Sequence, residues 1–468
     1  MMDSKFSDQF IEYLEPHIDE MLNDLSGLIA IPSVRDLASR TELAPFGQPI
    51  RRAFDYLIEF AQKNGLEVRD HQGYALDISV GQGDQEIALL HHVDVVSAGD
   101  EAQWRTPPYQ MTREGNLLFG RGVTDNKGPL MASLYILKLF KQMDVPLTKK
   151  IRVIIGGAEE TTWECVEHYF KHNPQPDFGF SPDGDFPIVN GEKGILYASL
   201  ERAFAQTSTK GTCQIIKLES ERDRTSTCHH LSAELAGSEA AKVAQKFAAF
   251  ADVIDCQSYH RVEFSTPWEK SRNPHKVDNC MDKFIDIMRH VDGLDANSAH
   301  LVNLLNSHFA NSHDGHKLGL NHQDDEMGPT TSCVSAINLD SHGYNLDFDF
   351  RFPKGLTIEQ VRSQLRALSQ QAGVNFIEQQ YLPLSYLSPE SALIQTMGKA
   401  YSDVTGMDAE CFSKGAASYA RALEHGVAFG PTFPGEVTFV HEPNEQLSLE
   451  SLIKAITIYV KVLISFQE

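Results

Sequence analysis

Five side chains that can bind divalent metal ions occur in this sequence at wide intervals, each at or near the end of an apolar run. They are His92 in ALLHHVDVV, Asp125 in GRGVTDNKGP, Glu160 in GGAEE, Asp183 in SPDGD and His441 in FVHEPNE. Carboxylate oxygen and imidazole nitrogen are ligands of hard and borderline divalent ions. Two such ions about 3.5–4 Å apart need a bridging carboxylate and further ligands on each side. The set therefore suits a pair of divalent ions, and the chemistry it predicts is hydrolysis.

Two more carboxylates adjoin this set. Asp94 follows His92 by two residues, so on an extended strand both side chains face the same side, and Asp94 could hold the second imidazole nitrogen. Glu159 and Glu160 are adjacent and cannot point the same way on a strand. One could bind metal while the other faces the substrate and its water, where it would be a natural general base.

Each of these residues also has a purely structural interpretation. Asp125 could be only the N-cap of the following helix, Asp183 only a turn residue, and the His92–Asp94 pair only part of a strand. An acidic pair is usually solvated, but Glu159 and Glu160 directly follow RVIIGG, where buried charge needs a reason. One shared metal site accounts for all five positions together, so we favour it.

Composition excludes several classes of partner. The 41 basic and 64 acidic residues give a formal net charge of −23, which opposes binding to nucleic acid or anionic membranes. No apolar run approaches the roughly 18 residues of a membrane span, and the acidic N-terminus lacks a secretory signal. Seven scattered cysteines without a CxxC pair indicate reduced thiols. We expect a cytoplasmic protein with neither nucleic-acid nor membrane partners.

The elements expected around the early motifs alternate in type. Helical spacing of apolar residues predicts helices over 5–30, 50–64 and 127–143. Short apolar runs predict buried strands over 87–95, 151–157 and 177–183. This order argues for an α/β layer structure, and strand ends in such a sheet present side chains into a common crevice.

The pattern of polar and apolar residues along the sequence changes at about residue 194. The segments 344–353 and 374–384 resemble strands, whereas 238–254 and 357–373 have helical patterns. Helices are expected again over 389–406 and 448–466, on either side of His441. If His441 joins the early motifs, residues 1–193 and 387–468 form one α/β domain with a mixed sheet and a discontinuous chain. Residues 194–386 then form an inserted α+β domain.

Several motifs resemble those of a known family in composition and order. They are LIAIPSV, HVDVV, GRGVTDNKGP, AEE, SPDGDFP, GEKG, DFRFP, SYARAL and GVAFGP. They resemble the M20 metallopeptidases and deacylases, and best match the PepV-like (Sapep-like) dipeptidase branch, over nearly the whole length. The resemblance implies a co-catalytic metal pair, usually zinc, in a domain covered by an inserted lid. Manganese and cobalt suit the same ligands.

The resemblance also implies a role for each residue of the metal site. Asp125 would bridge both ions, His92 and Asp183 would complete one site, and Glu160 and His441 the other. Glu159 would be the general base, and Asp94 would orient a ligand. The peptide bond between Asp125 and Asn126 would be cis.

Further roles are implied for the lid and the substrate loop. Arg351 in DFRFP matches the arginine that binds the substrate's terminal carboxylate, which suits a guanidinium fork. A lid histidine would polarise the scissile carbonyl. The family's loop for it is absent, and NPHKVDN favours His275, with His260 as the rival. In GAASYA, Ser418 replaces a substrate-contacting threonine.

Together these features predict a metal-dependent dipeptidase. Its substrates would be dipeptides or short peptides with a free C-terminal carboxylate. A deacylase of N-acyl amino acids and a metal-binding homologue without turnover are the alternatives. The long lid favours a monomer over a homodimer.

Overall fold

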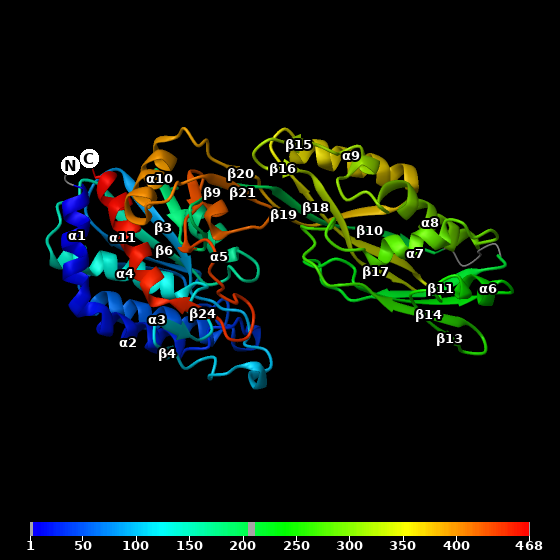
Figure 1. The fold of residues 1–468 in the computed structure, drawn as a ribbon, viewed down its shortest axis with the longest axis horizontal. Helices are drawn as coiled ribbons and strands as arrows, with labels where there is room; N and C mark the ends of the chain where they lie inside the picture. The colour runs from blue at the N-terminus through cyan, green and yellow to red at the C-terminus, as the bar shows by residue number, and fades with distance from the viewer. Residues whose placement is uncertain (1–2, 205–210, 468) are drawn as a thin grey trace. The chain divides into compact units, whose positions relative to one another are not determined.

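The chain forms two compact units, and the first is assembled from both ends of the sequence. The structure, a computed structural model, describes residues 3–204 and 211–467. Unit 1 comprises Met1–Gly191, Ser385–Phe412 and Ser418–Glu468; unit 2 comprises Glu192–Leu384 and Ser413–Ala417. In unit 1 the first helix packs against the last, drawn in blue and red in Figure 1.

A nine-stranded mixed sheet forms the centre of unit 1. Its strand order is β1-β2-β6-β3-β7-β22-β9-β20, with β21 paired to β9. The strands are β1 (Glu67–His71), β2 (Ala75–Val80), β3 (Glu86–His92), β6 (Lys150–Gly156), β7 (Phe178–Ser181), β9 (Ile188–Glu192), β20 (Ser385–Tyr386), β21 (Cys411–Lys414) and β22 (Gly426–Ala428). β3 runs parallel to β6 on one side and to β7 on the other, whereas β1, β2 and β6 pair antiparallel. The prediction of an α/β fold with a mixed sheet is confirmed.

Smaller pairings and helices surround this sheet. β4 (Thr112–Glu114), β5 (Leu117–Phe119) and β24 (Gln446–Ser448) form a three-stranded sheet, and β8 (Gly184–Asp185) pairs with β23 (Pro431–Thr432). The helices are α1 (Asp3–Leu14), α2 (Ile18–Ile29), α3 (Gln48–Lys63), α4 (Lys127–Gln142), α5 (Glu164–His172), α10 (Ala392–Thr405) and α11 (Leu449–Ser465). Three of the 3₁₀ turns of unit 1 are Glu15–His17, Leu37–Ser39 and Glu101–Gln103. Helix α4 and strand β6 agree with the helix predicted over 127–143 and the strand predicted over 151–157.

Helix α4 is the packing centre of unit 1. It contacts β2, β3 and β6 on one side and α2 and α11 on the other. All residues from Lys127 to Phe140 are buried, because other elements enclose the helix on both sides, and most of these residues are apolar. Because α4 is packed on both sides, the loop that leads into its first residue, Lys127, is held in place at that end.

The single helix expected over 5–30 is wrong in one respect. Helices α1 and α2 are separated by the 3₁₀ turn Glu15–His17, which contains Pro16. Proline has no amide hydrogen and clashes with the preceding turn, so it interrupts an otherwise continuous helical pattern.

Unit 2 is an eight-stranded antiparallel sheet packed against helices. Its order is β13-β14-β12-β11-β17-β18-β10-β19. The strands are β10 (Gly194–Ala203), β11 (Gln214–Ser220), β12 (His230–Ala236), β13 (Asp252–Asp255), β14 (His260–Ser265), β17 (Thr331–Leu339), β18 (Gly343–Phe352) and β19 (Asn375–Leu382), with β15 (Gln323–Asp324) and β16 (Gly328–Pro329) paired separately. The helices are α6 (Ala240–Gln245), α7 (Cys280–Met288), α8 (Ala296–His308) and α9 (Ile358–Ala372). Their apolar side chains and those of the sheet share one core.

The helix expected over 238–254 is wrong in its second half. Helix α6 ends at Gln245, and β13 begins at Asp252 as an edge strand. Val253 pairs with Val262 of β14, so pairing with a neighbouring strand overrides the local helical preference.

Among the helices of the described residues, none combines the length and apolar character that crossing a membrane requires.

We expect Leu134→Ala to lower the free energy of unfolding by about 2–5 kcal/mol, because it opens a cavity in the core. Leu134 is fully buried in α4, and denaturant unfolding followed by circular dichroism measures the change. The same substitution at Leu37, which is 54% exposed, should change it by less than about 0.5 kcal/mol. Equal losses of unfolding free energy in the two variants would contradict the close packing of α4.

Candidate metal centre

The carboxyl ends of three neighbouring parallel strands supply part of the site. His92 is the last residue of β3, Glu160 follows β6, and Asp183 follows β7. Because β3 lies between β6 and β7 and runs parallel to both, these three side chains come to one edge of the sheet.

Asp125 lies between two imidazoles that are far apart in the sequence. Its Oδ1 is 2.9 Å from His92 Nε2, and its Oδ2 is 3.0 Å from His441 Nε2. The interpretation of Asp125 as a helix cap does not hold, because the N-cap of α4 is Asn126 and that side chain makes no capping bond. The peptide bond between Asp125 and Asn126 is cis, as expected.

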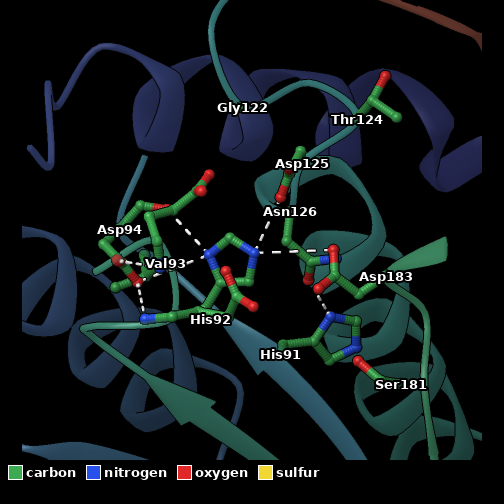
Figure 2. Close-up of polar contacts among 12 residues, drawn as sticks. His91, His92, Val93, Asp94, Gly122, Thr124, Asp125, Asn126, Ser181 and Asp183 are labelled. Atoms are coloured by element: carbon green, nitrogen blue, oxygen red, sulfur yellow. Dashed lines mark hydrogen bonds and ion pairs between the residues drawn. The ribbon is translucent and has the colours of Figure 1, made fainter. Parts of the chain in front are cut away.

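Two further carboxylates complete the arrangement. Glu160 Oε2 lies 3.0 Å from His441 Nε2, and Asp183 Oδ1 lies 3.7 Å from His92 Nε2. We call His92, Asp125, Glu160, Asp183 and His441 the ligand set. Figure 2 shows His92 with its ring directed toward Asp125 and Asp183.

The ligand set fits a divalent cation. One ligand atom each from His92, Asp125 and Glu160 lie within 4.8 Å of one another. His92 Nε2 is buried and makes no hydrogen bond of normal geometry with the described residues, although it approaches Asp125 as an ion pair. Buried polar atoms normally have partners, so this nitrogen and the oxygens around it suit a bound cation.

Without a cation, protons balance the charge of the ligand set. Desolvation opposes protonation of both histidines, although the side chain of His441 is 53% exposed. The neighbouring carboxylates nevertheless raise the pKa of His92 well above its usual value and that of His441 to about 11. The same imidazoles hold the pKa of Asp125 far below its usual range, against the effect of burial. Burial, with the charge of Asp125 adding to it, raises the pKa of Glu160 to about 7.

Asp94 binds the backbone that carries both glutamates. Its two carboxylate oxygens accept hydrogen bonds from the backbone N–H groups of Glu159 and Glu160, at 3.2 and 3.1 Å. His92 Nδ1 is 3.0 Å from the backbone carbonyl of Asp94 and 3.5 Å from its carboxylate. The carbonyl is thus the nearer acceptor for the imidazole, while the carboxylate fixes the turn after β6.

The carboxyl group of Glu159 lies beside the ligand set in a region of negative charge. Burial raises its pKa well above the usual value, and the charges of Asp183, Glu160 and Asp125 act in the same direction. A bound cation would reverse that local field and favour the ionised carboxylate.

Glu445 holds the loop that presents Asp125, and the sequence-based reasoning missed it. This fully buried carboxylate accepts bonds from Arg121 Nη1 at 2.7 Å and from the backbone N–H groups of Gly122, Thr124 and Asp125 at 2.9, 2.9 and 3.0 Å. Glu445 follows His441 by four residues, and an acidic residue so near a candidate ligand was the available signal.

Ser418 directly precedes Tyr419, a residue whose ring packs against His92. It precedes the 3₁₀ turn Tyr419–Ala422. The ring of Tyr419 packs edge-on against His92, with centroids 5.9 Å apart, and its hydroxyl lies 3.0 Å from Cys165 Sγ. Tyr419 therefore buries one side of the His92 ring.

The two remaining candidate residues belong to unit 2. Arg351 on β18 is 5% exposed; its Nε and Nη2 donate to the Asp349 carboxylate at 3.0 and 2.6 Å, and its Nη1 donates to the Gly415 carbonyl. His275 is exposed and lines a hollow of about 600 Å³ with Asp282 and His313. The structure thus holds Arg351 rigidly and leaves His275 at the surface of its own unit.

Comparisons with known proteins agree on one family. Residues 88–465 match the model of peptidase family M20/M25/M40. A Staphylococcus aureus protein (strain bovine RF122 / ET3-1) named "Putative dipeptidase" is 31% identical over 467 residues, covering 97% of this chain and 98% of its own. Human carnosine dipeptidase 1 has a similar fold, with a TM-score of 0.60, 17% identity and 98% of each chain covered. Aminoacylhistidine dipeptidase from Vibrio alginolyticus also has a similar fold, with a TM-score of 0.61 and 14% identity, covering 95% of this chain and 96% of its own.

We expect metal binding at pH 7 to release protons. The raised pKa of His441, about 11, means that its imidazole carries a proton at pH 7 in the metal-free protein, and an imidazole must lose that proton to bind a cation. Metal affinity should therefore increase as the pH rises toward that value. Titration calorimetry with zinc, in buffers of different ionisation enthalpy, measures the protons released.

The variant His441→Ala should release fewer protons per zinc ion bound. A binding enthalpy that is independent of the buffer in the unaltered protein would contradict the protonated state of the metal-free site.

Proposed function

We propose that this chain, which belongs to peptidase family M20/M25/M40, is a metal-dependent dipeptidase that uses two divalent cations. The observation that carries the proposal is the carboxylate of Asp125, whose two oxygens each face a different imidazole at 2.9 and 3.0 Å. A carboxylate with a partner on each oxygen is what a bridging ligand between two ions requires.

The ligand set divides naturally around Asp125. His92 and Asp183 would hold one ion, and Glu160 and His441 the other, which follows the observed contacts on each side of the bridge. We propose zinc, and manganese or cobalt would suit the same donors. When bound, the cations would polarise the amide carbonyl and acidify water.

Glu159 would move the proton in the reaction. Its carboxylate would take a proton from the attacking water and pass it to the leaving amine. The position of its carboxyl group beside the ligand set supports this role, because bound cations would favour the ionised carboxylate, which is the form that can accept a proton. The bonds from Asp94 to the backbone of Glu159 and Glu160 would keep the two glutamates in their separate roles.

Three residues would handle the substrate. Arg351 would bind the C-terminal carboxylate, and its bonds to Asp349 support this because they hold the guanidinium in one orientation. Ser418 would contact the substrate beside Tyr419, and His275 would polarise the carbonyl. The named relatives support dipeptides as the substrate class. A cytoplasmic location and a monomeric state stay predictions.

One experiment tests the whole proposal. The purified protein would be loaded with zinc, manganese or cobalt, its metal content measured, and its activity compared on dipeptides and N-acyl amino acids. Two equivalents of metal with dipeptide cleavage are expected. Cleavage of acyl amino acids alone would make the chain a deacylase, and bound metal without cleavage would make it a binding protein.

We expect Glu159→Gln to lower kcat for dipeptide hydrolysis by about 10²–10⁴-fold, because the amide cannot accept the proton. Metal content should remain unchanged, since Glu159 is outside the ligand set. Glu164→Gln is the matched control, because Glu164 lies nearby at the start of α5 and is 51% exposed. Full activity in Glu159→Gln would exclude Glu159 as the base.

We expect Arg351→Lys to raise KM for dipeptides by about 10–100-fold, the size of a lost hydrogen bond to a charged group. Steady-state kinetics on a dipeptide and its C-terminal amide would also show a smaller preference for the free acid. Arg362→Lys, a change at a partly exposed position of helix α9 that pairs with Glu378, is the control. An unchanged preference in Arg351→Lys would place carboxylate recognition elsewhere.

A further inference from the structure

His91 is a buried histidine that stands outside the ligand set. It precedes His92 on β3, and neighbouring residues on a strand point to opposite faces, so its ring is directed away from the metal centre. It is fully buried, and a polar ring in such a place must find hydrogen-bond partners. Figure 2 shows the ring of His91 beside Asn126.

Both ring nitrogens of His91 have partners. Nδ1 lies 2.5 Å from Asn126 Oδ1, and Nε2 lies 2.9 Å from Ser133 Oγ on α4. Neither nitrogen is therefore left to bind a metal ion, and the ring links the start of α4 with its second turn.

The partners of Asn126 determine which groups donate. Asn126 Nδ2 donates to the Pro182 carbonyl at 2.7 Å and to Asp183 Oδ1 at 3.0 Å, and a carbonyl can only accept. Its Oδ1 must then face His91, so Nδ1 of His91 donates and Nε2 accepts from the Ser133 hydroxyl. A single proton assignment satisfies every bond in this series.

We propose that His91 is a positioning residue for the metal ligand Asp183 and acts on it through Asn126. His91 holds the Asn126 amide in one orientation, and that amide directs an N–H group at Asp183 Oδ1, the oxygen that faces His92 Nε2 at 3.7 Å. Replacing a group that holds a metal ligand in place typically weakens metal binding by about 10–100-fold. This inference rests on the proposed function, because it requires Asp183 to bind metal.

The test measures zinc affinity by competition with a chromophoric chelator. His91→Leu keeps the ring's approximate volume and removes both bonds, so we expect about 10–100-fold weaker binding of one of the two ions, the one that Asp183 would hold. His91→Asn places an amide N–H where Nδ1 stood and should recover most of the affinity. Tyr135→Phe is the matched control, because it removes a partly buried hydrogen bond from α4 to Asp24 that does not reach the site.

A double-mutant cycle separates positioning from general stability. If His91 acts through Asn126, the losses of zinc affinity in His91→Leu and Asn126→Ala will not add in the double variant. Additive losses, or unchanged affinity in His91→Leu, would overturn the proposal. If His91→Leu does not fold, Ser133→Ala removes only the outer anchor of the ring and should still weaken zinc binding, and unchanged affinity there would equally overturn it.

The wild-type protein keeps the two proposals apart. Failure of the wild type to bind zinc would contradict the proposed function itself. Zinc binding by the wild type with equal binding by His91→Leu would contradict only the role of His91.

Discussion

The structure of unit 1 depends on placing several carboxylates in one buried region without letting their mutual repulsion open it. Asp125, Glu160 and Asp183 converge at the carboxyl edge of the sheet, and in the metal-free protein the imidazoles of His92 and His441 oppose their charge. Either protons or divalent cations can therefore neutralise the negative charge of these carboxylates. A cation is the better one, because it carries two charges and binds several oxygens at once.

Holding that arrangement requires support from parts of the chain that bind no metal. Asp94 fixes the turn after β6 by accepting two backbone N–H groups, and Glu445 fixes the loop before α4 by accepting three. Both are buried carboxylates that are satisfied mainly by the backbone, which leaves the ligating side chains free of that task. The ligand geometry is thus set by hydrogen bonds one layer away from it.

The sequence was most informative where a side chain directly follows an apolar strand. His92, Glu160 and Asp183 could be placed together because strand ends in an α/β sheet meet at one edge, and Asp125 and His441 joined them as further metal-binding side chains near apolar runs. Residues that act through the backbone or through another side chain, such as Glu445 and His91, have no comparable signal, since their partners are set only by the tertiary fold. The same reason explains the helix wrongly extended to residue 254, where strand pairing determined the outcome.

The discontinuity of unit 1 has a consequence for synthesis on the ribosome. The strands β20, β21 and β22 and the candidate ligand His441 all come after residues 192–384, the main segment of unit 2, and α11, which packs against α1 and α4, follows them. A nascent chain therefore carries the four earlier candidate ligands in an incomplete sheet while that segment emerges. The candidate metal centre can be completed only after residue 441 has been synthesised, so a metal ion that arrives earlier would meet fewer of its ligands.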